Sequence, residues 1–170
     1  PFFIILFGSI FSVMWVKLSK IGKNPSIPLK FCFGIVQLAL GFLLTQVGFQ
    51  FVNEAYQVPI LTLVFLYMLH TTGELFLSPI GLSMVTKLSP KSMAGTAMGA
   101  WFLSFAIANY VGGKIAALTG GHGGGEVSSA EDGLLQYLDT FATIGYVLLA
   151  IAALIFVLNK PIQKLMHGVE

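Results

Sequence analysis

The sequence predicts an all-α membrane protein with five transmembrane helices, and three observations lead to this prediction. Hydrophobic residues make up 56% of the 170 positions, and the mean hydropathy is +0.87. Only 9% of the residues are charged, whereas a soluble domain carries about 25%. The apolar residues fall into five long runs. These features exclude a soluble domain and a disordered chain, and a net charge of only +2 excludes a nucleic-acid-binding protein.

The five apolar runs are each expected to form a helix. They cover residues 1–16, 28–51, 59–85, 92–118 and 134–158. A bilayer core of about 30 Å requires about 20 helical residues, so only the first run is too short to cross it. Strands are not expected, because an open backbone edge cannot face lipid and the alternating pattern of a barrel is absent. Since the first run begins at Pro1, inside an apolar stretch, we expect the chain to be a fragment of a longer protein.

The segments between the runs contain residues that end helices. Gly22 and Pro25 follow the first run, and Pro90 lies in the short connection before the fourth. The connection at residues 119–133 is rich in glycine and is predicted to be a flexible external loop. Its His122 is expected to be solvated rather than a metal ligand, because no second His or Cys lies nearby.

The placement of lysines predicts which ends of the helices face the cytoplasm. Eight of the nine lysines fall in alternate connections or after the last run, at positions 17, 20, 23, 30, 87, 91, 160 and 164. The other connections carry mainly acidic residues, with only Lys114 near their level. By the positive-inside rule, the side with eight lysines is cytoplasmic, so the chain starts outside and ends inside.

Glycines at helical spacing are expected to let the helices approach one another closely. The second run has glycines every seven residues, and the fourth has a small-xxx-small pair followed by two more. These residues are Gly34, Gly41 and Gly48 in the second run, and Gly95, Gly99, Gly112 and Gly113 in the fourth. Bundle packing is the interpretation that we favour for all of them over a gating role.

The third run contains the most informative residue, Glu74. It lies 15 residues after Pro59 and 13 before Lys87, so it is about 20 Å from either end and near the bilayer midplane. A carboxylate at that depth costs at least about 2.5 kcal/mol on insertion scales, so it must face a cavity or a partner. His70 and Ser78 lie four residues before and after it and are expected on the same face. The stripe indicates the lining of a pathway, and a structural partner for an unseen basic residue is the alternative.

Three further residues extend this interpretation. Pro79 removes a backbone donor next to Ser78, and broken helices near the midplane are typical of transporter substrate sites. His70 can modulate the protonation of Glu74. Trp101 lies nine residues after Ser92, about 14 Å into the fourth run, which is too deep for an interfacial tryptophan. Position alone leaves core packing and a cavity wall open for Trp101.

No enzyme motif, metal site or cofactor site is found in the sequence. The three histidines, at positions 70, 122 and 167, lie in different regions, and no histidine is placed to activate Ser83. No glycine-rich phosphate loop joins a strand to a helix. The single cysteine, Cys32, excludes an intrachain disulfide and is expected to be a small packed residue.

Two stretches resemble a known family. The residues HTTGELFLSPIGLSMVTKLSP at 70–90 closely resemble the tenth helix of proton-dependent oligopeptide transporters, and GTAMGAWFL at 95–103 resembles their eleventh. The resemblance covers nearly the whole chain, as the eighth to twelfth helices of a major facilitator superfamily fold. It therefore implies that residues 1–170 form part of the C-terminal helical bundle.

The resemblance also implies a function, which is proton-coupled symport of di- and tripeptides by alternating access. The proton gradient would be the driving force, with no cofactor. Short peptides, protons, membrane lipid and an absent N-terminal half of the same transporter are the implied partners, in a bacterial cytoplasmic membrane. The resemblance assigns peptide binding to Glu74, Ser78, Leu82 and Trp101, and proton-linked roles to Glu74 and His70.

Two alternatives come from other readings of the same residues. One is a different secondary carrier, for cationic or drug-like solutes, that uses the same acidic cavity. The other is a membrane scaffold subunit that does not transport. Upstream sequence would discriminate between them, because helices with an acidic and arginine cluster would favour transport.

Overall fold

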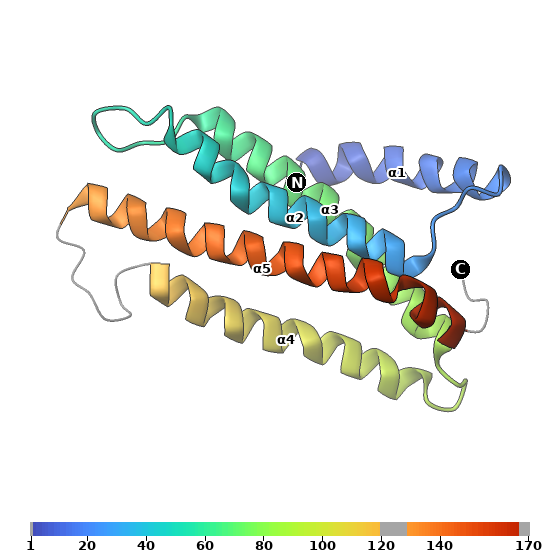
Figure 1. Cartoon of the computed structure of the whole chain (residues 1–170). Coiled ribbons are helices and arrows are strands. Elements are labelled where there is room, and N and C mark those ends of the chain that lie inside the picture. Colours follow the sequence, from blue (N-terminus) through green and yellow to red (C-terminus); the bar gives the residue numbers. More distant parts are fainter. Residues whose placement is uncertain (1, 120–128, 167–170) are drawn as a thin grey trace.

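The part of the chain that the structure describes folds into five helices, which confirms the predicted all-α class. The computed structural model describes residues 2–119 and 129–166 (Figure 1). Its helices are α1 (Phe2–Lys20), α2 (Ile27–Phe49), α3 (Ile60–Leu88), α4 (Ala94–Thr119) and α5 (Ala130–Leu165). The greater part of the glycine-rich connection, with His122, and the C-terminal His167 lie outside the described residues.

Four of these described helices, α1, α2, α3 and α5, are long and apolar enough to cross a membrane. For α1 this corrects the expectation that the first run is too short, because the helix continues beyond residue 16 to Lys20. The fourth helix, α4, is also long, at 26 residues, but it is not among these four. Its sequence contains four glycines, Asn109 and Lys114.

The last helix differs most from its expected range of 134–158, since α5 has 36 residues and extends at both ends. At its start, the Ser129 side chain accepts a hydrogen bond from the Asp132 backbone N–H at 3.1 Å. Glu131 and Asp132 in the first turn add negative charge where the helix dipole favours it. At the other end the helix continues through Pro161.

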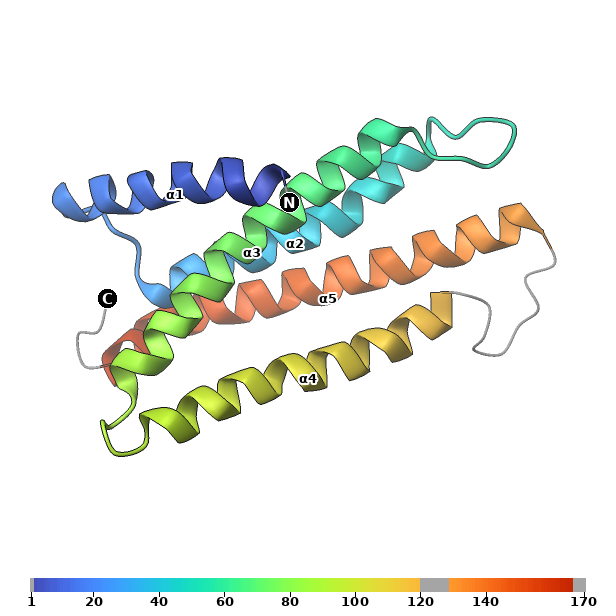
Figure 2. The ribbon, with the colours of Figure 1, turned by 180° about the vertical axis from the view of Figure 1, so that it is seen from behind.

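The helices form a bundle in which α2 is central and packs mainly against α3 and α5. Figures 1 and 2 show α1 on one side of this core and α4 on the opposite side. The α1–α2 and α3–α4 connections and the C-terminal end of α5 lie at one end of the bundle (Figure 1). The lysine-rich segments, which alternate with the acidic connections along the chain, therefore lie together at one end of the bundle.

Glycines allow α2 to lie close to its neighbours. A Cβ on Gly34 would lie 2.9 Å from the Gly73 carbonyl oxygen of α3, and one on Gly48 would lie 2.5 Å from Thr62 Cγ2. A Cβ on Gly41 would meet His70 Nε2 at 2.6 Å. The packing role predicted for the α2 glycines is therefore confirmed.

The same prediction is wrong for α4 among the described residues. A Cβ on any of its four glycines, at positions 95, 99, 112 and 113, would meet nothing within 4 Å. The reason is that α4 contacts only α3 and α5, and sparsely, so that no described side chain of α4 is buried.

Candidate functional site

Glu74 lies in a recess between the start of α1 and the first half of α3. The recess has a volume of about 430 Å³. Its lining is largely aromatic and aliphatic, and it consists of Phe2, Phe3, Ile4, Leu63, Val64, Tyr67, Thr71 and Glu74. Glu74 is the one charged residue of this lining. A single carboxylate beside apolar side chains suits a ligand that carries a positive charge beside apolar groups.

The residues beside Glu74 determine which way its side chain faces. Gly73 is buried against α2, where its Cβ position would be 2.8 Å from the Gly34 carbonyl oxygen. Phe76 is also buried, and its ring makes edge contacts with Phe11 and Trp15 of α1, at centroid distances of 5.1 and 5.2 Å. With these two residues fixed against α2 and α1, the intervening helix presents Glu74 away from α2, and its side chain is exposed.

His70 faces α2 rather than the Glu74 recess. Its ring packs against Phe42 at a centroid distance of 4.6 Å, and its buried Nε2 atom has no hydrogen-bond partner within the described residues. The expected stripe is divided because four residues turn a helix by about 400°, so each step along the stripe moves the side chain round by about 40°. His70 and Ser78 therefore differ in direction by about 80°.

Ser78 and Trp101 share a second recess, formed by α2, α3 and α4. It has a volume of about 350 Å³ and is lined by Phe31, Ile35, Leu77, Ser78, Trp101, Ser104, Phe105 and Ala108. Trp101 also lines a third hollow of about 560 Å³, between the second half of α3 and α4. The indole rests on Gly81, where a Cβ would come within 2.7 Å of Trp101 Cζ2. Trp101 thus both packs against α3 and forms a cavity wall, the two roles that its position left open.

Leu82 lies one turn beyond Ser78 and is 38% exposed. It does not line the three hollows described above. The structure therefore brings Ser78 and Trp101 together, while Glu74, His70 and Leu82 face other directions.

The aromatic wall of the Glu74 recess was not predicted from sequence. Phe2 and Phe3 lie about 70 positions before Glu74 along the chain, and they meet it only because α1 crosses α3. No spacing rule within one helix connects such residues. Among the described residues, no cluster of three His, Cys, Asp or Glu side chains could hold a metal ion.

The chain was compared with known families, sequences and structures. The sequence model of the POT family matches residues 1–124. Dipeptide and tripeptide permease A of Edwardsiella piscicida is 35% identical over 168 residues, which are 99% of this chain and 34% of that protein. The permease of the same name from Serratia proteamaculans is 35% identical over 161 residues, or 95% of this chain and 31% of that protein.

A solved structure is also similar to this chain. The crystal structure of a peptide transporter POT in complex with sulfate has a TM-score of 0.80 and 32% identity, covering 99% of this chain and 31% of that one. The chain thus spans about a third of the length of these relatives. Together with the four helices that are apolar enough to cross a bilayer, these matches identify an integral, multi-pass membrane protein.

Proposed function

Because the chain belongs to the POT family, we propose that it forms five helices in the C-terminal half of a proton-coupled symporter of di- and tripeptides. The permeases and the peptide transporter to which it is similar support this proposal, since the chain aligns with about a third of each. The family consists of transporters rather than enzymes, so the chemistry of the site is binding and release. The observation that carries the proposal is the single carboxylate of Glu74 in an otherwise apolar recess.

In this proposal, Glu74 binds the amino end of the peptide. An ionised carboxylate in apolar surroundings costs free energy unless a positive charge or a proton neutralises it. A peptide ammonium group provides the charge, and a proton provides the alternative when the site is empty. The two can therefore replace each other on Glu74, which links substrate binding to proton release.

The remaining predicted residues have roles around this contact. Ser78, Leu82 and Trp101 contribute to binding the rest of the peptide when an N-terminal half closes over this bundle. His70 packs against α2 and does not touch Glu74. Its effect on the protonation of Glu74 is therefore indirect, through α3, the helix that the two residues share. The driving force is the proton gradient, with no cofactor, and the membrane is the bacterial cytoplasmic membrane, in keeping with bacterial relatives.

Uptake by proteoliposomes tests the proposal, using the complete transporter to which we assign this chain. Labelled dipeptide should accumulate when the outside is more acidic than the inside, and a protonophore should abolish the accumulation. Glu74→Gln should remove nearly all proton-driven uptake, because it removes both the charge and the proton site. Glu54→Gln, which changes an exposed carboxylate in the α2–α3 connection, is the matched control and should transport normally.

Two results would refute the proposal. One is normal uptake by the Glu74→Gln variant at wild-type expression. The other is uptake of organic cations without uptake of dipeptides, which would assign the same recess to a different class of carrier.

A further inference from the structure

Gly81 lies where three helices meet, and its nearest neighbours are two aromatic rings. It is a buried residue of α3. A Cβ at this position would lie 2.7 Å from Trp101 Cζ2 of α4 and 3.2 Å from Phe31 Cζ of α2. A Cβ essentially never approaches another heavy atom within 3.0 Å, so the indole can occupy this place only because Gly81 has no side chain.

Both rings are walls of the same recess. Phe31 and Trp101 line the recess of about 350 Å³ that contains Ser78, which we call the Ser78 recess. The hollow of about 560 Å³ beyond it is lined by Trp101 but not by Phe31. A side chain at position 81 would act as a wedge between the two rings, so the shape of the Ser78 recess depends on the absence of that side chain.

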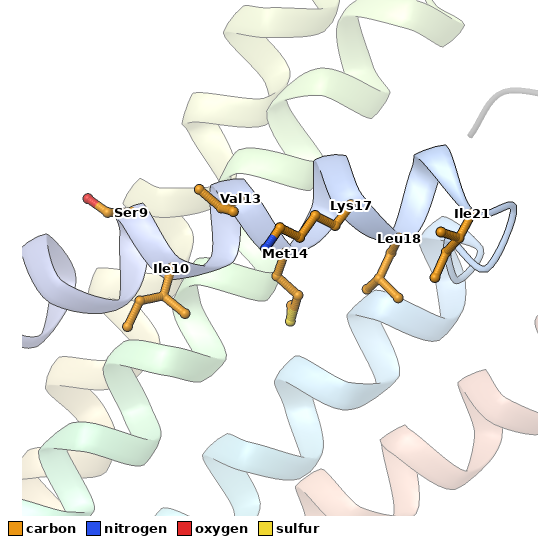
Figure 3. Close-up of a pocket in the computed structure, with 7 residues that line it drawn as sticks. All are labelled: Ser9, Ile10, Val13, Met14, Lys17, Leu18 and Ile21. Carbon is orange, nitrogen blue, oxygen red and sulfur yellow. The ribbon is translucent and has the colours of Figure 1, made fainter.

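The Ser78 recess differs in construction from a hollow of about 670 Å³ on α1. That hollow is lined only by residues between Ser9 and Ile21, in α1 and just after it (Figure 3). No second described helix gives it a wall. The lining of the Ser78 recess comes from α2, α3 and α4, and the seat of Trp101 on Gly81 is formed by described residues alone.

The Ser78 recess lies one helical turn from the proposed binding site of the peptide amino group. Ser78 follows Glu74 by four residues, which is about 6 Å along α3. An extended peptide advances about 3.3–3.6 Å per residue, so two residues span a similar distance. A dipeptide whose ammonium group contacts Glu74 therefore brings its second side chain to the level of Ser78 and Trp101.

We propose that Gly81 is a specificity-determining residue, which positions the Trp101 indole and so sets the size of the second side chain that the Ser78 recess accepts. Gly81 acts through Trp101 and does not touch the peptide. Large apolar side chains suit the recess, because its lining is mainly aromatic and aliphatic. This role rests on the proposed function, because it requires that a peptide binds at Glu74.

Calorimetric binding of two dipeptides to the complete transporter tests this role. Alanylalanine and alanylphenylalanine differ only in the second side chain, and the readout is the ratio of their dissociation constants. A variant that is merely less stable loses binding sites without changing that ratio. Gly81→Ala should weaken alanylphenylalanine about tenfold relative to alanylalanine, because the added methyl group forces Trp101 and Phe31 into the recess.

Gly48→Ala is the matched control. A Cβ on Gly48 would lie 2.5 Å from Thr62 Cγ2, so the contact is as tight as at Gly81, but neither Gly48 nor Thr62 lines the Ser78 recess. This variant should leave the ratio of the two dissociation constants unchanged.

A double variant tests whether the effect passes through the indole. Trp101→Leu removes the ring atoms that contact Gly81 but keeps an apolar side chain. In this background Gly81→Ala should leave the ratio unchanged, so the effects of the two substitutions are not additive. If Gly81→Ala alone gives a low yield of folded transporter, the double variant should restore the yield, because the leucine leaves room for the Cβ.

Four results would overturn the role of Gly81. They are an unchanged ratio in Gly81→Ala, an equal change in Gly48→Ala, the same change with and without the indole, and a low yield that Trp101→Leu does not restore. A wild-type transporter that binds neither dipeptide would instead refute the proposed function, so the two failures are distinguishable.

Discussion

At position 74 a carboxylate lies among aromatic and aliphatic side chains from two helices. On the surface of a soluble protein, Glu74 would be an ordinary solvated carboxylate. Its depth follows from counting along the chain, because about 20 Å of helix separates it from either end of the apolar run. Its surroundings do not follow from counting, because Phe2 and Phe3 approach it from another helix.

The contact between Tyr56 and Glu131 gives a prediction at the level of single residues. The Tyr56 hydroxyl donates a hydrogen bond to Glu131 Oε2 at 2.9 Å, joining the α2–α3 connection to the start of α5. Asn53 Oδ1 accepts hydrogen bonds from the backbone N–H groups of Ala55 and Gln57, at 3.0 and 2.9 Å. These bonds hold the connection in shape while Tyr56 adopts a left-handed backbone with φ of 57°.

The hydrogen bond to Glu131, and then the negative charge of that carboxylate, raise the pKa of Tyr56 above its ordinary value of about 10. A raised pKa means that the fold favours the neutral hydroxyl, so this contact stabilises the chain below pH of about 10 and is lost as the pH rises through the folded-state pKa. Glu131→Gln should therefore lower the pKa of Tyr56. Ultraviolet difference titration measures it, with Tyr56→Phe identifying the signal. An unchanged titration in Glu131→Gln would contradict the contact.

The positions of single residues along one helix could be read from the sequence, whereas their neighbours from other helices could not, and the binding roles of these residues stay predictions. Glu74, Ser78 and Trp101 were all picked out by position on a single run, and each lines a hollow in the structure. His70, Glu74 and Ser78 were expected to share one face of α3. Each step of four residues turns the side chain by about 40° around the helix, so the three side chains point in different directions. That small angle is enough to place His70 against α2 and Ser78 near α4.

The pairing of α2 with α3 depends on two glycines that face each other. Gly73→Ala would place a Cβ 2.8 Å from the Gly34 carbonyl oxygen and 3.2 Å from Leu38 Cγ. Backbone cannot yield as a flexible side chain does, so the helices must separate at a cost of about 1–3 kcal/mol. The midpoint of thermal unfolding in detergent should fall accordingly.

Gly112→Ala on α4 is the matched control for this substitution. A Cβ there meets nothing within 4 Å, and alanine favours a helix more than glycine does. Its unfolding midpoint should stay the same or rise. Equal losses in the two variants would mean that the contact between α2 and α3 is not the cause of the loss.

The elements themselves were largely predictable because hydrophobic length is a strong signal in membrane helices. The ends of α5 were not, since its first turn depends on the Ser129 cap, and its last turns continue beyond the apolar run through Pro161. The glycine pattern of α4 was misread for a different reason. Small residues permit close packing, but they do not supply a neighbour.

The arrangement of the whole molecule supports a prediction about topology. The lysine-rich connections lie at one end of the bundle, and the α2–α3 connection lies at the other (Figure 1). By the positive-inside rule, the first end is cytoplasmic. In a Cys32→Ser background, Ser19→Cys should react with a membrane-impermeant maleimide only after the cells are opened. Ala55→Cys should react in intact cells, and the reverse pattern would contradict the orientation.

The central claim is that the Glu74 carboxylate binds the amino group of a peptide, and a binding cycle tests it most directly. Affinities of a dipeptide and its N-acetylated form are measured by calorimetry for the complete transporter and for Glu74→Gln. If the two groups touch, acetylation weakens binding to the wild type strongly and to the variant hardly at all, so the effects are not additive. If acetylation and Glu74→Gln instead cost independent amounts that add, the carboxylate is not the partner of the amino group.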